Sequence, residues 1–375
     1  MTKLEQLMRQ IIKHGPISKK ELQERTGVSW GTVSGLITQL VEDRFVVPSV
    51  RQTSDVGRKA EEFDVNSADH LCIGIDLSQC GLLGVVTDLR GRIVMKREQI
   101  FQTPEKEEVL QEIFKMTDAF LEAFSDKTVW GIGFSVQGIV EIYEGVSVLI
   151  SGIKDWENVP LKDIMKDRYG LQTYTEHDPN CAMLAERFVG CLKNRQVTEA
   201  TLLTFNPMFG AGISIMTRGQ ICHGIRGRAG EVGCNPVDIT KDGTWHHLED
   251  YLSANGLLEA YRSRTGTSLT YEEFVRLLEQ GDDHCTAIYQ QLGRYFGFAL
   301  SIANNYLNPE VIILNIDGVQ QKILYDEISR IVKAVSFDPE VQIIISKALS
   351  EMKAIGAAMI ISEKAVATLY FYTPP

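Results

Sequence analysis

Residues 29–40 carry side chains of the kind that contact DNA bases. Apolar residues recur at helical spacing along one face of this stretch. The opposite face carries hydroxyl groups and one indole, and its candidate DNA-binding residues are Ser29, Trp30, Thr32, Ser34 and Thr38. Hydroxyl groups can donate to and accept from base edges, and an indole can press on a thymine methyl group. The stretch therefore predicts a DNA-recognition helix.

Two glycines, Gly31 and Gly35, lie four residues apart within this predicted helix. Each glycine costs a helix about 1 kcal/mol relative to alanine. We interpret them as positions where the helix backbone approaches a DNA groove closely.

Basic residues follow in the polar stretch 49–59, namely Arg51, Arg58 and Lys59. In a loop between two strands, such residues enter a minor groove or neutralise phosphates, which adds affinity more than sequence information. Two other interpretations stay open. The segment could dock a protein instead of DNA, or these side chains could form only a solvated loop.

Three predicted helices and a hairpin position these residues. Apolar residues at helical spacing between Leu4 and Ile12 predict a first helix that ends at His14-Gly15-Pro16. Ser18 and Glu21 have the spacing of a capping box for the second helix, and Ser29 is expected to cap the third. Strands at 45–47 and 61–65 complete a winged helix-turn-helix over residues 1–65.

The composition excludes several classes of protein. The chain has 375 residues, of which 44% are hydrophobic and 23% charged, as in ordinary globular proteins. No apolar run approaches the roughly 20 residues of a membrane span, and the seven cysteines contain no CxxC spacing, so we expect a cytoplasmic protein. Residues 1–65 carry ten basic and nine acidic residues, although the whole chain has a net charge of −11. The net charge therefore does not argue against DNA binding by this segment.

Beyond residue 66, strand meanders alternate twice with helices, which predicts two α/β lobes. Several stretches, taken in order, resemble the ROK family of repressors and sugar kinases. They are His14–Leu40, Gly57–Asn66, Ile73–Ser78, Gly131–Glu141, Trp156–Met165, Glu176–Glu186, Gly227–Asp238, His247–Glu259, Asn304–Leu314 and Ile355–Met359. The resemblance implies a winged helix-turn-helix followed by a two-lobed, actin-like sugar-kinase domain of the ribonuclease H-like type over 66–375. Its first lobe would cover about 70–185 with a C-terminal helix at about 353–370, and its second about 186–350.

The resemblance places the general base of the family's kinases at Asp178. The glycine-rich turns that hold ATP phosphates through backbone amides are altered here, at 76–80 and 206–212. Pro207 has no amide to donate and Phe209 is bulky, and the family's adenosine-side glycine pair is replaced at 315–316. We therefore expect no kinase activity and no catalytic residue. The alternative is a divergent sugar kinase with an accessory N-terminal domain.

The resemblance also implies a partly retained sugar pocket. The candidate ligand-binding residues are Gly138, His177, Asp178, Glu231, Cys234 and Glu249. A cluster of carboxylates suits a polyol, because each accepts strong hydrogen bonds from hydroxyl groups. His177 and Cys234 depart from the family's asparagine and histidine. The alternative is that the carboxylates are relics that stabilise only turns and helix caps.

Many family members hold a structural zinc through one histidine and a cysteine-rich loop. Here Cys234 and His247 occupy two ligand positions, with His246 adjacent, but no further cysteine precedes Glu249. Because structural zinc is held by four ligands, we expect no metal and no other cofactor.

These observations predict a transcriptional regulator, a repressor of carbohydrate-utilisation genes. Its partners would be double-stranded operator DNA, a small carbohydrate effector and further copies of itself in a homodimer or tetramer. The divergent kinase and a protein-interaction scaffold without ligand binding are the alternatives.

Overall fold

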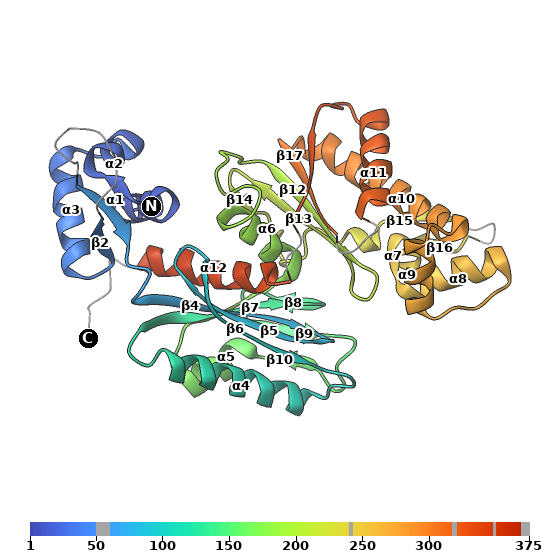
Figure 1. Cartoon of the computed structure of the whole chain (residues 1–375), viewed down its shortest axis with the longest axis horizontal. Coiled ribbons are helices and arrows are strands. Elements are labelled where there is room, and N and C mark those ends of the chain that lie inside the picture. The colour runs from blue at the N-terminus through green and yellow to red at the C-terminus, as the bar shows by residue number, and fades with distance from the viewer. Residues whose placement is uncertain (50–60, 240–242, 317–320, 348–349, 369–375) are drawn as a thin grey trace. The chain divides into compact units, whose positions relative to one another are not determined.

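The computed structural model describes residues 1–49, 61–239, 243–316, 321–347 and 350–368 (Figure 1). Arg51, Arg58 and Lys59 lie outside these ranges. The chain divides into two compact units. The first comprises residues 1–189 and 351–375, and the second residues 190–350.

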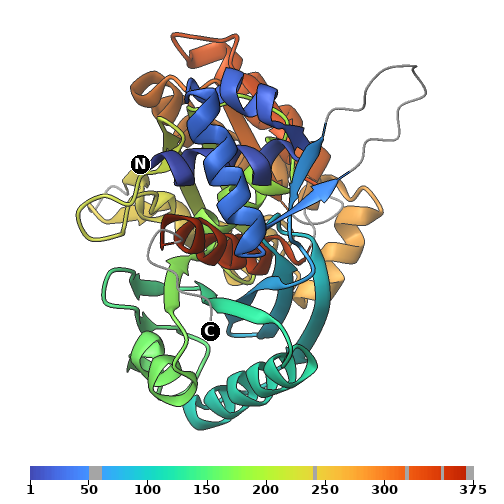
Figure 2. The same ribbon diagram turned by 90° about the vertical axis from the view of Figure 1, so that its left-hand side faces the viewer.

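Residues 1–65, here called the head, form the expected winged helix-turn-helix (Figure 2). The elements are α1 (Lys3–His14), β1 (Ile17–Ser18), α2 (Lys19–Thr26), α3 (Trp30–Glu42), β2 (Val46–Ser49) and β3 (Glu62–Val65). The strands pair in the order β1-β3-β2, and β3 runs antiparallel to both neighbours. The three helices and the hairpin are confirmed, and the two-residue strand β1 is an addition to them.

Local capping explains where the head helices begin. The Ser18 hydroxyl accepts a hydrogen bond from the Glu21 amide at 3.2 Å, and the Ser18 amide donates to the Glu21 carboxylate at 3.0 Å. This confirms the predicted capping box. The prediction for Ser29 was wrong in one respect: it holds the N-cap position of α3 but bonds no backbone amide. Its hydroxyl lies 2.9 Å from that of Thr32, so the two side chains satisfy each other.

The rest of the first unit is the first lobe. Its elements are β4 (His70–Ser78), β5 (Gly81–Asp88), β6 (Ile93–Ile100), α4 (Lys106–Ala123), β7 (Thr128–Val136), β8 (Ile139–Glu141), β9 (Val146–Leu149), β10 (Glu157–Val159), α5 (Leu161–Tyr169), β11 (Thr173–His177), α6 (Asp178–Phe188) and α12 (Met352–Thr368). The main sheet has the order β11-β7-β4-β5-β6, and β8–β10 form a small second sheet. In the main sheet β7 pairs in parallel with β4 and β11, whereas β5 is antiparallel to its neighbours.

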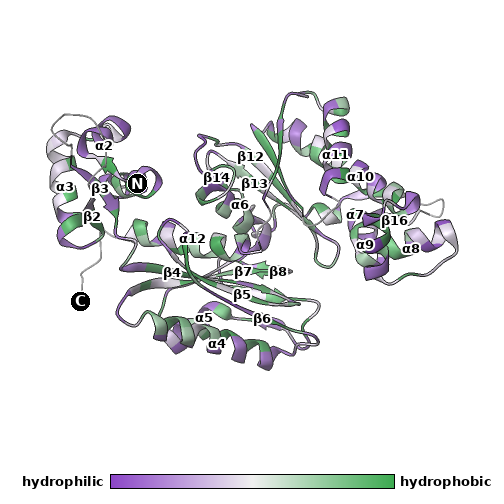
Figure 3. Ribbon diagram, in the orientation of Figure 1, coloured by the Kyte–Doolittle hydropathy of each residue, from purple (hydrophilic) through white to green (hydrophobic). Residues whose placement is uncertain are grey.

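Helices cover both faces of the main sheet (Figure 1). On one face α12 packs so closely that a side chain at Gly74 or Gly133 would meet the backbone of Ala354 or Ala357. On the other face α4 buries its apolar side, and its outward side is hydrophilic (Figure 3). The absence of side chains at the two glycines sets how closely α12 can approach β4 and β7.

The second unit contains another five-stranded sheet, in the order β14-β13-β12-β17-β18. Its elements are β12 (Ala200–Asn206), β13 (Gly210–Thr217), β14 (Gln220–Ile221), a short 3₁₀ helix (Val232–Cys234), β15 (Pro236–Ile239), β16 (Trp245–His247), α7 (Leu248–Leu252), α8 (Ala254–Thr265), α9 (Tyr271–Glu279), α10 (Asp283–Leu307), β17 (Val311–Ile316), α11 (Gln321–Val335) and β18 (Gln342–Ile345). Side chains of the sheet and these helices share one apolar core. Among the described residues, no helix is both long and apolar enough to cross a bilayer.

One arginine, Arg90, joins the head to the first lobe. Its guanidinium donates hydrogen bonds to the carbonyl oxygens of Ile11 (2.8 Å) and Ile12 (2.9 Å) in the last turn of α1, and it pairs with the Asp64 carboxylate in β3. The Arg90 side chain is 9% exposed. A cation at the C-terminal end of a helix also meets the negative end of the helix dipole. This contact therefore stabilises α1 and the junction together.

An aromatic cluster forms a second contact at the junction. The His70 ring stacks on Phe45 with centroids 4.7 Å apart, and Trp130 Nε1 donates a hydrogen bond to His70 Nδ1 at 3.2 Å. Because Nδ1 accepts, the proton is on Nε2, which donates to the Arg44 carbonyl oxygen at 3.1 Å. Burial lowers the pKa of His70. The neutral ring thus links Arg44 and Phe45 of the head, which directly precede β2, to β7 of the lobe.

We predict that Arg90→Met lowers the free energy of opening of α1 by about 3 kcal/mol, because it removes a buried cation from the Asp64 carboxylate and from two helix carbonyls. Native-state hydrogen exchange of the α1 amides measures this energy. Arg92→Met is the matched control, since the Arg92 side chain is exposed and two residues away. Equal protection of α1 in both variants would show that Arg90 does not hold the junction.

Candidate functional site

The predicted recognition helix α3 separates a buried face from an exposed one. Val33, Ile37 and Leu40 are buried in the head. Trp30 is 52% exposed although it is a large apolar side chain. Of the other predicted DNA-contacting residues, Ser29 and Thr38 are exposed, and Thr32 and Ser34 are half-buried. The predicted orientation of the helix is therefore confirmed.

The two glycines of α3 lie on open surface. In the described part of the chain, a Cβ atom added at Gly31 or Gly35 would have no atom within 4 Å apart from its chain neighbours and the adjacent turns of its own helix backbone. Packing within the head therefore gives no reason for glycine at either position. Close approach of an external backbone, as in a DNA groove, is a physical reason that remains.

A second candidate site forms where β11 meets α6. The helix begins at Asp178, and Pro179 fits its first turn, where the missing amide of proline leaves no bond unmade. Asp178 Oδ2 lies 2.6 Å from Lys353 Nζ, and Oδ1 lies 3.5 Å from His177 Nε2. The Asp178 carboxylate is buried, with the residue 9% exposed.

Charge decides the protonation state of Asp178. Burial alone would raise its pKa, but the Lys353 ammonium and then His177 outweigh burial, so the pKa of Asp178 is lowered. The carboxylate is therefore ionised at neutral pH and is held by an ion pair. Asp76 nearby accepts a hydrogen bond from the Ser135 hydroxyl at 2.6 Å, and burial raises the pKa of Asp76.

Lys353 was missed by the sequence analysis. Its position beside the apolar run 354–361 marks only the start of a helix, and Asp178 lies 175 residues earlier in the chain. A lysine in the first turn of a helix is unfavourable for the helix dipole, and this is the one local signal that it has a tertiary partner.

The turn at 78–81 lies in the stretch where the resemblance places the first phosphate loop. It is a tight hairpin in which Ser78 pairs with Gly81. The Gln79 amide donates to the Gln137 side-chain oxygen at 3.0 Å, and the Cys80 amide lies 3.3 Å from the Ser78 hydroxyl. Both amides of the turn thus have partners within the protein. Gly138, with φ +86°, follows Gln137, and a side chain there would meet the Leu149 carbonyl oxygen.

The second altered loop, at 206–210, is also a closed turn. Asn206 accepts from the amides of Met208 (2.8 Å) and Phe209 (2.9 Å), and the Pro207 carbonyl accepts from the Ala254 amide. The residues between β12 and β13 therefore use their amides within the second unit.

The predicted residues of the second unit gather around Glu249. Its carboxylate lies beside Gly210 and Gly233, where an added Cβ would stand 3.3 Å and 3.1 Å from its oxygens. Burial raises the pKa of the Cys234 thiol, and the nearby charges of Glu231 and Glu249 raise it further. Glu231, Cys234 and Glu249 are all exposed.

His246 and His247, which the resemblance places beside the zinc loop of other family members, lie at the start of α7. His247 is the N-cap of α7, where its amide donates to the Asp250 carboxylate at 2.9 Å. His246 Nδ1 lies 3.8 Å from the same carboxylate. Within the described ranges, no group of three or more His, Cys, Asp or Glu side chains has the geometry of a metal site.

Comparisons with known proteins find matches for both the head and the region that follows it. The ROK family profile matches residues 72–364, and a profile described as winged helix-turn-helix DNA-binding matches residues 3–47. The xylose repressor of Bacillus subtilis is 25% identical over 317 residues, which covers 82% of this chain and 80% of that protein.

Solved structures share the fold. A ROK family transcriptional regulator described as a homologue of the Escherichia coli MLC protein superposes with a TM-score of 0.81 at 20% identity, over 97% of each chain. A ROK family glucokinase from Streptomyces griseus, in complex with glucose and AMPPNP, gives a TM-score of 0.62 at 20% identity, over 77% of this chain and 98% of that one. The fold alone is thus common to regulators and kinases.

We predict that Gly35→Ala raises the stability of the head by about 1 kcal/mol, because alanine is the better helix former and has open space here. The same methyl group should weaken DNA binding at least tenfold, because it lies on the exposed face of α3. Urea denaturation and fluorescence anisotropy measure the two effects. The expected gain in stability is the control for the expected loss of DNA affinity, because a misfolded variant would lose both stability and DNA affinity. Unchanged DNA affinity would contradict the role given to this glycine.

Proposed function

The chain belongs to the ROK family, and we propose that it is a cytoplasmic DNA-binding transcriptional regulator that represses carbohydrate-utilisation genes and responds to a small carbohydrate. The observation that carries this proposal is the exposed, hydrogen-bonding face of α3 on a winged head that is fused to a ROK domain. Sugar kinases of the same fold have no need of such a face.

The head is proposed to read double-stranded operator DNA through α3. Trp30 at the start of the helix would contact a thymine methyl group, and the hydroxyl groups of Ser29, Thr32, Ser34 and Thr38 would bond to bases or phosphates. Arg51, Arg58 and Lys59 would contribute phosphate or minor-groove contacts. Because one head offers few base contacts, we propose that the protein binds a two-fold operator as a homodimer or as a tetramer.

The effector is proposed to be a neutral sugar. A set of hydroxyl-binding residues is proposed in each unit: Asp178 and His177 near Gly138 in the first, and Glu231 and Glu249 near Cys234 in the second. Carboxylates are suited to this role because each accepts more than one hydroxyl bond. D-Xylose and D-glucose are the first probes, because a similar protein is named a xylose repressor and a similar solved structure contains glucose.

The protein is proposed not to transfer phosphate. A general base must be free to take the proton of the attacking hydroxyl, whereas Asp178 is held by Lys353 at 2.6 Å. A phosphate would also need backbone amides, and those of Gln79, Met208 and Phe209 are bonded within the protein. Both observations support a regulator over the divergent kinase.

We predict that the protein binds DNA from its own upstream region in preference to a scrambled duplex of equal length, and that this preference persists near physiological salt. Non-specific phosphate binding falls steeply with salt, whereas base contacts do not. Fluorescence anisotropy over a salt series measures both affinities. Equal and salt-sensitive binding to the two duplexes would overturn the proposed regulator.

We predict that D-xylose or D-glucose changes operator affinity, and that Glu231→Ala removes this response while leaving sugar-free DNA affinity within about twofold. Asp283→Ala, an exposed acidic residue at the start of α10, is the control. A response that survives Glu231→Ala would exclude this residue from the site. Turnover of ATP with glucose that is lost in Asp178→Asn would establish the kinase instead.

A further inference from the structure

We propose that α12 couples the Asp178 site to the head, with Lys353 as the residue that senses the ligand and Glu363 as the residue that positions α1. This inference rests on the proposed function, because it assigns the route by which a bound sugar changes DNA affinity. The proposed route consists of α12 and the ion pairs that Lys353 and Glu363 form near its two ends.

At one end of α12, Lys353 bridges the helix to the candidate ligand site. Its ammonium lies 2.6 Å from Asp178 Oδ2, and its side chain is 24% exposed, whereas that of Asp178 is 13% exposed. A sugar hydroxyl can donate to the Asp178 oxygen that Lys353 now holds, and its own oxygen can accept from the ammonium. A polyol therefore competes with the ion pair for both partners.

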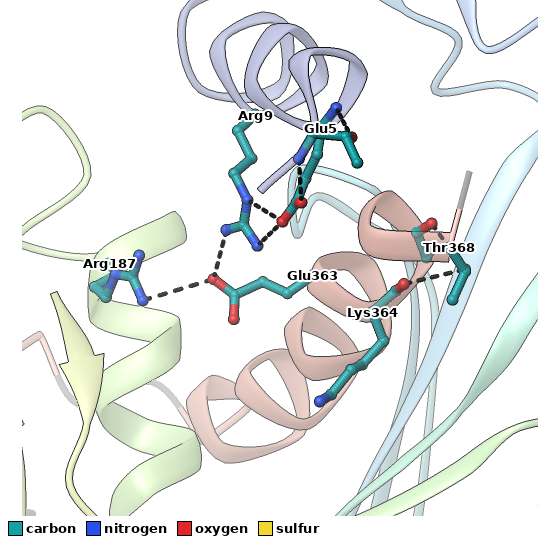
Figure 4. Close-up of polar contacts among 8 residues, drawn as sticks. Glu5, Arg9, Arg187, Glu363, Lys364 and Thr368 are labelled. Atoms are coloured by element: carbon teal, nitrogen blue, oxygen red, sulfur yellow. Dashed lines mark hydrogen bonds and ion pairs between the residues drawn. The ribbon is translucent and has the colours of Figure 1, made fainter. Parts of the chain in front are cut away.

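Near the other end, Glu363 joins the head to α6 (Figure 4). Its Oε1 lies 3.7 Å from Arg9 Nη1 in α1 and 3.6 Å from Arg187 Nη1 in α6. Arg9 also bonds to Glu5, whose carboxylate completes the capping box of α1. A displacement of Glu363 thus reaches the first two turns of a head helix directly.

Helices α6 and α12 run side by side and in parallel between these ends. Asp178 and Lys353 pair at their starts, and Arg187 and Glu363 pair nine and ten residues later. Between the two pairs, Gly356 lies against the backbone of Cys181, where no side chain would fit. The ten residues from Lys353 to Glu363 span about 15 Å of helix.

The packing makes α12 move as one body. Its close contacts with Gly74 and Gly133 leave no room for local bending, so a change at Lys353 shifts or rotates the helix as a whole. Lys353 lies in the first turn, where the helix dipole disfavours a cation, so this end depends on Asp178 to stay in place. Loss of the pair therefore favours a second position of α12.

The head end is suited to carry a signal because it contributes little stability. Arg9 and Glu363 have side chains that are 38% and 28% exposed, and such pairs stabilise proteins only weakly. The head is held by Arg90 and by the apolar core that it shares with α12. Changing Glu363 thus alters how α1 is positioned without unfolding the head.

The first test measures hydrogen exchange of the α1 amides in the full chain without DNA. We expect Lys353→Met to change exchange in residues 3–14 at least threefold, and Lys353→Arg, which keeps the charge, to retain the wild-type rates. Lys96→Met is the matched control, because Lys96 pairs with Glu351 beside the same end of α12 but does not contact Asp178. Changes confined to the surroundings of residues 178 and 353, or an equal change in Lys96→Met, would overturn the proposal.

The second test is a double-mutant cycle on operator affinity with Lys353→Met and Glu363→Gln. Because about 15 Å separates the two residues along the helix, independent effects should multiply. We expect the double variant to depart at least threefold from the product of the single effects. The cycle of Lys353→Met with Lys364→Gln should multiply, since Lys364 lies over the Tyr174 ring and not on the head. Multiplicative behaviour in both cycles would overturn the proposal.

The two tests separate this proposal from the proposed function. If the wild-type chain fails to prefer its operator, the regulator is wrong, and the exchange experiment still decides whether α12 joins Lys353 to α1. If operator binding is specific but α1 does not respond to Lys353→Met, the regulator stands and the route through α12 is wrong.

Discussion

The buried guanidinium of Arg90 is the interaction on which the arrangement of the first unit depends. It leaves the end of β5, caps the carboxyl end of α1 and pairs with a strand of the head. A winged head attached only by a flexible linker would leave α1 free to rotate. Here the bonds to two consecutive carbonyl groups set the direction of α1, and the His70 ring holds Arg44 and Phe45, which directly precede β2. The head and the first lobe therefore share a core, and α12 belongs to that core.

This shared core explains why one C-terminal helix can be important for two distant sites. α12 contributes buried residues to the packing around the head, and its backbone also contacts the two strands that lead toward Asp76 and Ser135. The glycines of β4 and β7 permit that contact, because any side chain would push the helix away. The same helix, α12, therefore contacts both the sheet of the first lobe and the core of the head.

The sequence predicted those parts of the fold that local chemistry determines. The Ser18–Glu21 capping box and the apolar spacing of Val33, Ile37 and Leu40 act over a few residues, so the head helices were recognised. Asp178 was found through the resemblance to the ROK family. Lys353 and Arg90 could not be found in this way, because their partners lie 175 and 26 to 79 residues away. The place of Lys353 in the first turn of α12 indicates a partner but does not identify it. Ser29 failed as a cap because a neighbouring hydroxyl competed for it, which spacing alone does not reveal.

The residues that the resemblance aligns with kinase elements share one structural property. In each case a group that catalysis would need free is bonded within the protein: the Asp178 carboxylate by Lys353, the Gln79 amide by Gln137, and the Met208 amide by Asn206. Catalysis requires groups that are poised for the transition state, whereas sensing requires a bonded state that a ligand can displace. A carboxylate already paired with a lysine meets the second requirement, because the ligand replaces one set of bonds with another. The ion pair that would keep Asp178 from acting as a general base is thus also a contact that a ligand can displace, and this is the property that the proposed regulator requires.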